Sequence, residues 1–237
     1  MTPPKNRGAS SGNFEFGALA EAKNYRRALV RRMSPHLRGK VAEIGAGIGQ
    51  MTGELLLLPG VTRLECVEPD PAFCREFKKA FPQAFLVEGT VKDIATKDWD
   101  GVVSINVLEH IEDDEGELSA YRGLLGEKHG VLALFVPARK ELYAPIDRDF
   151  GHYRRYDKRE LETKLDRAGF KVRLACHYDF VGYFAWWLNF RLIKKRSFDP
   201  AAVRAFDRLV FPWADWIESR LSRPPIGKNL FVIAEAL

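Results

Sequence analysis

The chain has 237 residues, of which 46% are hydrophobic and 29% charged, and 37 Lys and Arg against 32 Asp and Glu give a formal net charge of +5. This composition excludes an intrinsically disordered chain, and the length suits one sizeable α/β domain. The three cysteines, Cys66, Cys74 and Cys176, are too few for a disulfide framework. The sequence contains no CxxC pair, so we do not expect structural zinc. Residues 1–13 lack the apolar core of a signal peptide, and no apolar run reaches the roughly 20 residues that span a bilayer, so we expect a cytoplasmic protein.

In chain order, we expect a disordered tail over 1–13 and a single domain over 14–237. A helical cap over 14–39 comes first, because apolar residues recur at helical spacing until Pro35 and Gly39 end the helix. Strand-like and helix-like segments then alternate, which predicts a mostly parallel sheet with helices on both faces. Strands are predicted over 41–44, 64–67, 85–88, 102–107, 131–136, 172–175 and 230–234, and helices over 51–58, 71–81, 118–125 and 157–168, the last with a capping box of Asp157 and Glu160.

Two long segments interrupt this alternation. Residues 137–156 are rich in Arg, Tyr, Asp and His, and residues 178–228 include helical stretches around 186–196 and 200–221. Insertions of this length are usually functional or disordered, and their aromatic content argues against disorder, so we expect both to cover a substrate pocket. In 180–196, aromatic residues are followed by three cations, a pattern that suits a helix at a membrane surface or along a substrate tunnel. A lid packed on the sheet is the alternative.

The most informative stretch is Val41–Gly49, V-A-E-I-G-A-G-I-G, in which a buried strand runs into a glycine-rich turn and then a helix. Glycines let a ligand lie against the backbone, and a helix N-terminus favours an anionic group. The spacing G-x-G-x-G differs from the G-x-G-x-x-G of nicotinamide-binding folds. An acid two residues before the first glycine, Glu43, suits a ligand with a positive ammonium. Glu68 ends the next strand, where an acid can accept both hydroxyls of a ribose.

Together with Ser104–Ile111 after the fourth strand, these motifs make residues 41–136 resemble the core of class I S-adenosylmethionine-dependent methyltransferases. Three further stretches extend the resemblance over 14–237 and are similar to a bacterial small-molecule branch: Asn24-Tyr25-Arg26, the G-H-Y-R-R-Y segment Gly151–Tyr156 and a closing strand over 227–236. The resemblance implies a Rossmann-like, doubly wound α/β fold. Its seven-stranded sheet would be mostly parallel with an antiparallel last strand, with helices on both faces.

The resemblance also implies S-adenosylmethionine as cofactor and names the residues that would hold it. The glycine turn would hold the methionyl end, and the acid after the second strand would hold the ribose. Thr90 stands where many relatives place an Asp for adenine, so we expect its hydroxyl or a backbone amide to serve instead. The expected set is Tyr25, Glu43, Gly45, Ala46, Gly47, Glu68, Pro69, Thr90, Asn106 and Leu108.

His110 is the first candidate for a general base and His152 the second, since an imidazole that titrates near neutrality can take a proton from a substrate hydroxyl. A structural role in the loops is the alternative for both. Three arginines could bind a carboxylate or phosphate, or could pair with nearby Asp residues to order the loop. The candidate substrate-binding residues are Arg148, Arg154, Arg155, Tyr183 and Trp187.

The acid-rich stretch 112–117 reads as a solvated helix start. Some related quinone O-methyltransferases bind a divalent metal through E-x-x-E-H, but Asn106 replaces the first Glu here, so we expect no metal.

These features predict a methyltransferase that acts on a small molecule, by O-methylation of a saccharide, lipid-linked or aromatic hydroxyl compound. Nucleic-acid or protein methylation and a non-catalytic S-adenosylmethionine-binding protein are the alternatives; no nucleic-acid partner is expected, because Asn106-Val107-Leu108-Glu109 lacks the D/N-P-P-Y/F motif. Residues 1–40 hold nine Lys and Arg and only two acids. This surplus near the expected pocket mouth favours an anionic or membrane-associated substrate and peripheral contact at the inner membrane face. The oligomeric state stays open.

Overall fold

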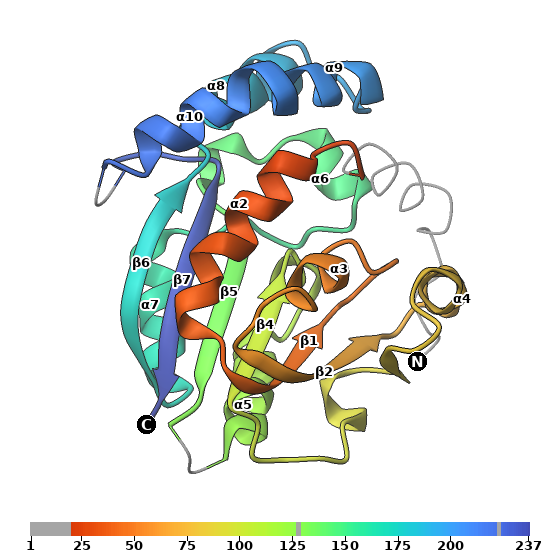
Figure 1. Cartoon of the computed structure of the whole chain (residues 1–237). Helices are drawn as coiled ribbons and strands as arrows, with labels where there is room; N and C mark the ends of the chain where they lie inside the picture. The colour runs from red at the N-terminus through yellow and green to blue at the C-terminus, as the bar shows by residue number, and fades with distance from the viewer. Residues whose placement is uncertain (1–19, 127–128, 222–223) are drawn as a thin grey trace, which may run out of the picture.

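A computed structural model describes residues 20–126, 129–221 and 224–237 (Figure 1). The predicted tail over 1–13 lies outside the described residues, as do residues 14–19 of the predicted cap. Within the described part, the cap contains helix α2 (Lys23–Met33) and a short 3-10 turn, η1 (Ser34–His36).

The seven-stranded, mostly parallel sheet predicted from the sequence is confirmed. Its strands lie in the order β3-β2-β1-β4-β5-β7-β6, and β7 runs antiparallel to both of its neighbours. The strands are β1 (Gly39–Ile44), β2 (Val61–Glu68), β3 (Phe85–Glu88), β4 (Gly101–Ile105), β5 (Val131–Pro137), β6 (Phe170–Tyr178) and β7 (Asn229–Ala236). β4 ends earlier than predicted because Asn106 adopts a left-handed φ of 53°, which takes the chain out of the extended conformation.

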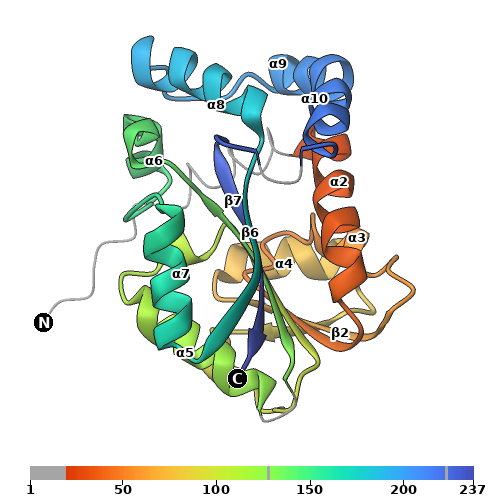
Figure 2. The ribbon, with the colours of Figure 1, turned by 90° about the vertical axis from the view of Figure 1, so that its left-hand side faces the viewer.

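Helices cover both faces of the sheet, as Figure 2 shows. One face packs on α5 (Asp114–Leu125) and α7 (Lys158–Arg167), whose apolar residues enter the first core cluster. The other face packs on α2, α3 (Thr52–Leu55) and α4 (Pro71–Ala80) in a second cluster. Short elements connect the strands: η2 (Val91–Asp93), η3 (Leu108–His110), η4 (Lys140–Leu142) and α6 (Pro145–Asp149).

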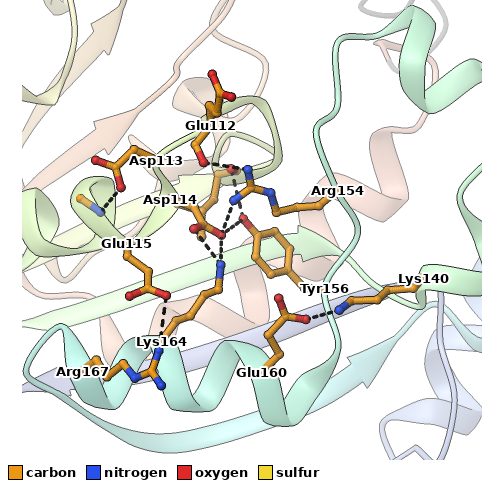
Figure 3. Close-up of polar contacts among 12 residues, drawn as sticks. Glu112, Asp113, Asp114, Glu115, Lys140, Arg154, Tyr156, Glu160, Lys164 and Arg167 are labelled. Atoms are coloured by element: carbon orange, nitrogen blue, oxygen red, sulfur yellow. Dashed lines mark hydrogen bonds and ion pairs between the residues drawn. The ribbon is translucent and has the colours of Figure 1, made fainter.

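The start of α7 differs in one detail from the prediction. Asp157 caps the helix and accepts from the Arg159 amide at 3.0 Å. The side chain of Glu160 turns instead to Lys140, with its Oε2 2.5 Å from Nζ (Figure 3). The predicted capping box is therefore reduced to the Asp157 cap, because an ion pair to another element takes the glutamate.

The long insertion between β6 and β7 forms a layer of helices beyond the carboxyl ends of the parallel strands (Figures 1 and 2). We call residues 180–221 the roof. It consists of α8 (Phe180–Trp186), the π-helical turn η5 (Trp187–Leu192), α9 (Pro200–Ala205), a second π-helical turn η6 (Phe206–Val210) and α10 (Phe211–Glu218).

Buried acids anchor the roof to α2. Asp207 accepts hydrogen bonds from the Asn24 and Tyr25 amides, both at 2.9 Å, and so caps α2 from a distant part of the chain. Asp215 pairs with Arg31 and Arg32 at 2.7 and 2.9 Å. The roof is therefore held at a fixed place over the strand ends.

Candidate functional site

The glycine-rich turn leaves β1 at its carboxyl end and is hydrogen-bonded to β2. The Gly45 and Ala46 amides donate to the Val67 carbonyl at 2.8 and 3.0 Å, and the Gly47 amide donates to Glu68 Oε2 at 2.8 Å. Positive φ values at Gly45, Gly47 and Gly49 give the turn its shape. The predicted strand–turn–helix unit is thus present, although α3 is shorter than predicted.

Two separate features of the structure require a glycine at position 45. Its φ is 72°, and a Cβ atom there would lie 2.3 Å from Cγ2 of Val107, which follows β4. A side chain at this position would therefore push the turn away from the end of β4.

Glu68 is buried at the end of β2. Its two carboxylate oxygens accept from the Gly47 amide and, at 2.9 Å, from the Asp70 amide. Burial raises the pKa of Glu68 despite these hydrogen bonds. Each carboxylate oxygen keeps acceptor capacity beyond its one backbone partner, as binding of a ribose diol requires.

Glu43 lies in β1, two residues before the turn, and its contacts are with the protein itself. It accepts from the Thr52 hydroxyl at 2.6 Å and from the Cys66 thiol at 3.4 Å. Burial raises the pKa of Glu43 to about 7. An ammonium group placed near it would favour the ionised form.

Beyond β3, Thr90 caps η2. Its amide and hydroxyl donate to Asp93 Oδ2 at 2.7 and 3.0 Å. In the sequence, Thr90 stands where many relatives have an Asp. In the structure, the carboxylate of Asp93 lies against Thr90. The T-x-x-D capping pattern was the signal that could have found it.

Pro69 and Leu108 are two further predicted cofactor contacts, and they lie in different surroundings. Pro69 follows Glu68 and joins β2 to α4. Leu108 has no exposed surface; it packs in the first core, and its carbonyl accepts from the Tyr156 hydroxyl at 3.2 Å. Its expected contact with the cofactor stays a prediction, and its side chain is covered by the first core in this conformation.

A cavity of about 570 Å³ lies between the strand ends and the roof. Tyr25 and Asn106 line one end, and the exposed residues Lys195, Ser197 and Ala202 line the other. The Tyr25 hydroxyl accepts from Asn229 at 2.8 Å, so the first helix and β7 are joined across the wall. The cavity therefore extends from the place where β4 ends to the surface of the roof.

His152 lines this cavity, and a buried acid fixes its ring. Its Nδ1 lies 3.1 Å from Asp147 Oδ1, and its Nε2 lies 4.0 Å from Oε1 of Glu109, another lining residue. Burial opposes charge on Asp147, but hydrogen bonds from His152, Arg155 and the Ala144 amide lower its pKa below the usual range. Because ionised Asp147 only accepts, Nδ1 carries a proton, and in the neutral imidazole the lone pair is therefore on Nε2.

His110 stands edge-on to His152, with ring centroids 4.6 Å apart. Burial and the neighbouring His152 lower the pKa of His110 to about 3, so its imidazole is neutral at pH 7. His110 does not line the cavity, whereas His152 does.

Glu109, His110 and His152 bring ligand atoms within 4.8 Å of one another. Within the described ranges, this is the group that could hold a metal ion. The sequence predicted no metal, and the arrangement offers two imidazoles and one carboxylate at that place.

A match that covers most of the chain assigns it to a family. A family model described as a methyltransferase domain matches residues 19–175. The chain belongs to this methyltransferase family. S-adenosylmethionine is its cofactor, and the buried Glu68 carboxylate beside a glycine-rich turn fits a nucleoside with a free diol.

Solved structures share the fold of this methyltransferase at low sequence identity. A chain of a complex that contains the Haloferax volcanii Trm112 methyltransferase activator is 15% identical, with a TM-score of 0.64 and coverage of 96% of this chain and 95% of that one. An S-adenosylmethionine-dependent methyltransferase from Thermotoga maritima is 18% identical, with a TM-score of 0.59 and 94% of each chain covered. Another from Clostridium acetobutylicum is 11% identical, with a TM-score of 0.58 and coverage of 90% and 91%. No curated protein gives a significant match.

Among the predicted arginines, only Arg155 lines the cavity of the methyltransferase. Its Nε and Nη2 bind Asp147 Oδ1 at 2.9 and 2.8 Å, and its guanidinium lies 4.4 Å from the centre of the Trp186 ring. The contacts of Arg155 therefore match the alternative in which an arginine pairs with a nearby Asp and orders the loop. Sequence reasoning missed Trp186, Lys228 and Asp179, which come from the roof and its flanks and line the same wall.

Arg154 is directed to another part of the methyltransferase. Its Nη1 lies 2.8 Å from Oδ2 of the buried Asp114, which also accepts from Tyr156 at 2.9 Å and Lys164 at 2.6 Å (Figure 3). The start of α5 is therefore partly an internal ion network instead of a solvated acidic surface. Arg148, Tyr183 and Trp187, like Arg154, are not among the residues that line this cavity, and their contacts with a substrate stay predictions.

Proposed function

We propose that this methyltransferase methylates a hydroxyl oxygen of a small molecule, such as a saccharide, a lipid-linked compound or an aromatic alcohol. The observation that carries the proposal is the cavity of about 570 Å³ with His152 and Asn106 on its wall. This volume is within the range typical of small-molecule sites, roughly 300–1,000 Å³. The roof above it restricts access by a folded macromolecule.

His152 is the proposed general base. S-adenosylmethionine supplies an electrophilic methyl group. Asp147 holds the imidazole of His152 with Nε2 unprotonated, so Nε2 can take the hydroxyl proton as the acceptor oxygen gains the methyl group. The aromatic and aliphatic walls position the acceptor and exclude water. This assignment reverses the order of the two histidines given by the sequence, because His152 lines the cavity and His110 does not.

One cation of the wall, Lys195, suits an acceptor that carries a negative group, although the wall also holds four acids. Lys228 lies 3.1 Å from Asp179, and Arg155 is bound to Asp147, so these cations are already paired inside the protein. Lys195 is exposed at the mouth and forms no ion pair among the described residues. It can bind a carboxylate or phosphate that remains near the surface.

Transfer of a tritiated methyl group to extracts of the source cells, separated into lipid, aqueous and macromolecular pools, tests the substrate class. We expect label in the lipid or aqueous pool. Label confined to nucleic acid or protein would contradict the proposal, and cofactor binding without transfer to any pool would indicate a non-catalytic binding protein.

The His152→Gln variant tests the base. We expect turnover to fall by about 10²–10⁴-fold, as is typical when a general base is lost, while calorimetric affinity for S-adenosylmethionine is unchanged. His36→Gln, in η1, is the matched control and should keep full turnover. Unchanged turnover in His152→Gln would eliminate this role.

A further inference from the structure

The roof carries most of the large apolar side chains that the described protein exposes. Twelve of the seventeen lie there, including Leu209 at 72% and Trp213 at 69% exposure. The twelve are Phe180, Phe184, Trp187, Leu188, Leu192, Ile193, Leu209, Val210, Trp213, Trp216, Ile217 and Leu221. Single exposed apolar residues are ordinary on a protein surface, but a concentration in one layer marks an interaction site.

These residues recur at helical spacing. Phe184, Leu188 and Leu192 follow one another four residues apart, and so do Leu209, Trp213 and Ile217. Residues with this spacing share one face of a helix. Trp186, Phe190 and Phe206 of the same segments line the cavity and are not among the exposed residues, so the two exposed faces are directed away from the cavity. Figures 1 and 2 show α8, α9 and α10 in one layer at the same end of the molecule.

The acids and the basic residues of the roof differ in exposure. Three of its four acids, Asp207, Asp215 and Glu218, are buried and bind groups below the roof. The fourth, Asp199, caps α9. All seven basic residues of the roof are exposed: Arg191, Lys194, Lys195, Arg196, Arg204, Arg208 and Arg220. Arg196 and Arg204 pair with Asp149 and Glu21, and Lys195 lines the cavity. The exposed apolar surface is therefore accompanied by four cations that form no ion pair among the described residues: Arg191, Lys194, Arg208 and Arg220.

We propose that this exposed surface of the roof docks on an anionic phospholipid bilayer. Apolar side chains that enter the interface and cations that meet anionic headgroups are the two contributions that hold a peripheral helix on a membrane. A second copy of the chain would bring like charges together, so a bilayer matches the surface better than self-association does. None of the helices in the described ranges is long and apolar enough to cross a membrane, so docking would be peripheral.

The docked orientation would bring the cavity mouth to the lipid. Lys195, Ser197 and Ala202 line the exposed end of the cavity and belong to the same layer of helices. An acceptor could then pass from the bilayer into the cavity. This step rests on the proposed function, whereas docking itself does not.

Co-sedimentation of the full chain with vesicles tests docking without any activity measurement. One set of vesicles is phosphatidylcholine alone, and the other contains about a third phosphatidylglycerol. We expect binding to the anionic vesicles that weakens at high salt, and weaker binding to the neutral ones. No binding to either set would overturn the proposal.

Two pairs of variants assign the binding to the roof. Leu209→Ser/Trp213→Ser removes apolar surface, and its control Leu57→Ser/Phe85→Ser removes exposed apolar surface elsewhere. Lys194→Glu/Arg208→Glu reverses roof charges, and its control Lys97→Glu/Lys171→Glu reverses exposed charges away from the roof. We expect each roof variant to weaken anionic vesicle binding by at least about tenfold and each control to bind like the wild type.

Light scattering after size exclusion tests the remaining alternative, in which a second copy of the chain covers this surface. Equal losses in roof and control variants would overturn the proposal. A wild-type dimer that Leu209→Ser/Trp213→Ser converts to a monomer, with no vesicle binding by the wild type, would show that a second copy covers this surface. Circular dichroism establishes that each variant is folded.

Discussion

His152 Nδ1 and Asp147 Oδ1 lie 3.1 Å apart, and the Asp147 carboxylate that fixes this ring is completely buried. The same oxygen accepts from Arg155, and Oδ2 accepts from the Ala144 amide at 2.8 Å. A residue in the cavity wall is therefore oriented by a group that the substrate does not touch. This relationship gives Asp147 a positioning role that can be separated from binding.

Asp147→Asn tests that role. The amide can donate to Nδ1 and stabilise the wrong tautomer of His152, so we expect kcat to fall by about tenfold or more with little change in KM or cofactor affinity. The variant also leaves Arg155 buried without its ionic partner, which costs about 3–5 kcal/mol of the free energy of unfolding. Steady-state kinetics and urea denaturation measure the two effects, and a variant that changes only stability would remove the positioning role.

Glu68→Gln should weaken S-adenosylmethionine binding. The neutral side chain loses the charge that strengthens hydrogen bonds to the Gly47 and Asp70 amides and to the ribose, and bonds of this kind contribute about 1.5–3 kcal/mol. We expect a Kd about 10–100-fold higher by isothermal titration calorimetry. Glu76→Gln, an exposed change on α4, should bind like the wild type; equal affinity in both variants would contradict the assignment.

Gly45→Ala should destabilise the protein and its cofactor site together. The positive φ and the 2.3 Å approach of Val107 leave no room for a methyl group, so we expect a loss of about 2 kcal/mol or more in the free energy of unfolding. Gly123→Ala, inside α5 with no atom within 4 Å of the new Cβ, is the matched control and should stabilise by about 0.5–1 kcal/mol. Chemical denaturation with and without S-adenosylmethionine measures both. A Gly45→Ala protein that binds the cofactor normally would show that the turn tolerates a side chain.

Glu43 should make stability depend on pH. Its folded pKa of about 7 is above the value of about 4.5 for a free glutamate, so below pH 4.5 the carboxyl is protonated in both states and costs nothing. As pH rises from 4.5 to 7, only the unfolded state ionises freely, and the wild type loses up to about 3 kcal/mol of stability. Glu43→Gln lacks this loss, so its stability relative to the wild type should increase over that range and level off above it. Urea denaturation at several pH values measures this, and a difference that does not vary with pH would show an ordinary pKa.

Much of the fold could be predicted because its signals are local. The alternation of buried strands and helices, the glycine turn at Gly45 and the Asp157 cap each occupy a few consecutive residues, and their spacing determines their geometry. The family-level cofactor assignment followed from the same local pattern. Element ends were less accurate where a single left-handed residue such as Asn106 or a distant ion pair such as that of Glu160 decided them.

The cavity depended on contacts between distant segments. Asp207 caps α2 from a position more than 180 residues later, and the sequence gives no indication of that pairing. Arg154 and Arg155 are neighbours with the same chemistry, yet they alternate sides of an extended segment, so one meets Asp114 and the other Asp147. Residue type alone could not choose between these partners.

The sequence by itself determined the α/β class, the strand–turn–helix unit and the acid at the end of β2, because backbone conformation and hydrophobic period are properties of neighbouring residues. Only the tertiary structure decided that His152 lines the cavity while His110 does not, that Asp93 faces Thr90, and that three of the four acids of the roof are buried while its basic residues are exposed. These outcomes depend on burial and on partners far along the chain, and the free energy of each charge is set by the surroundings that folding provides.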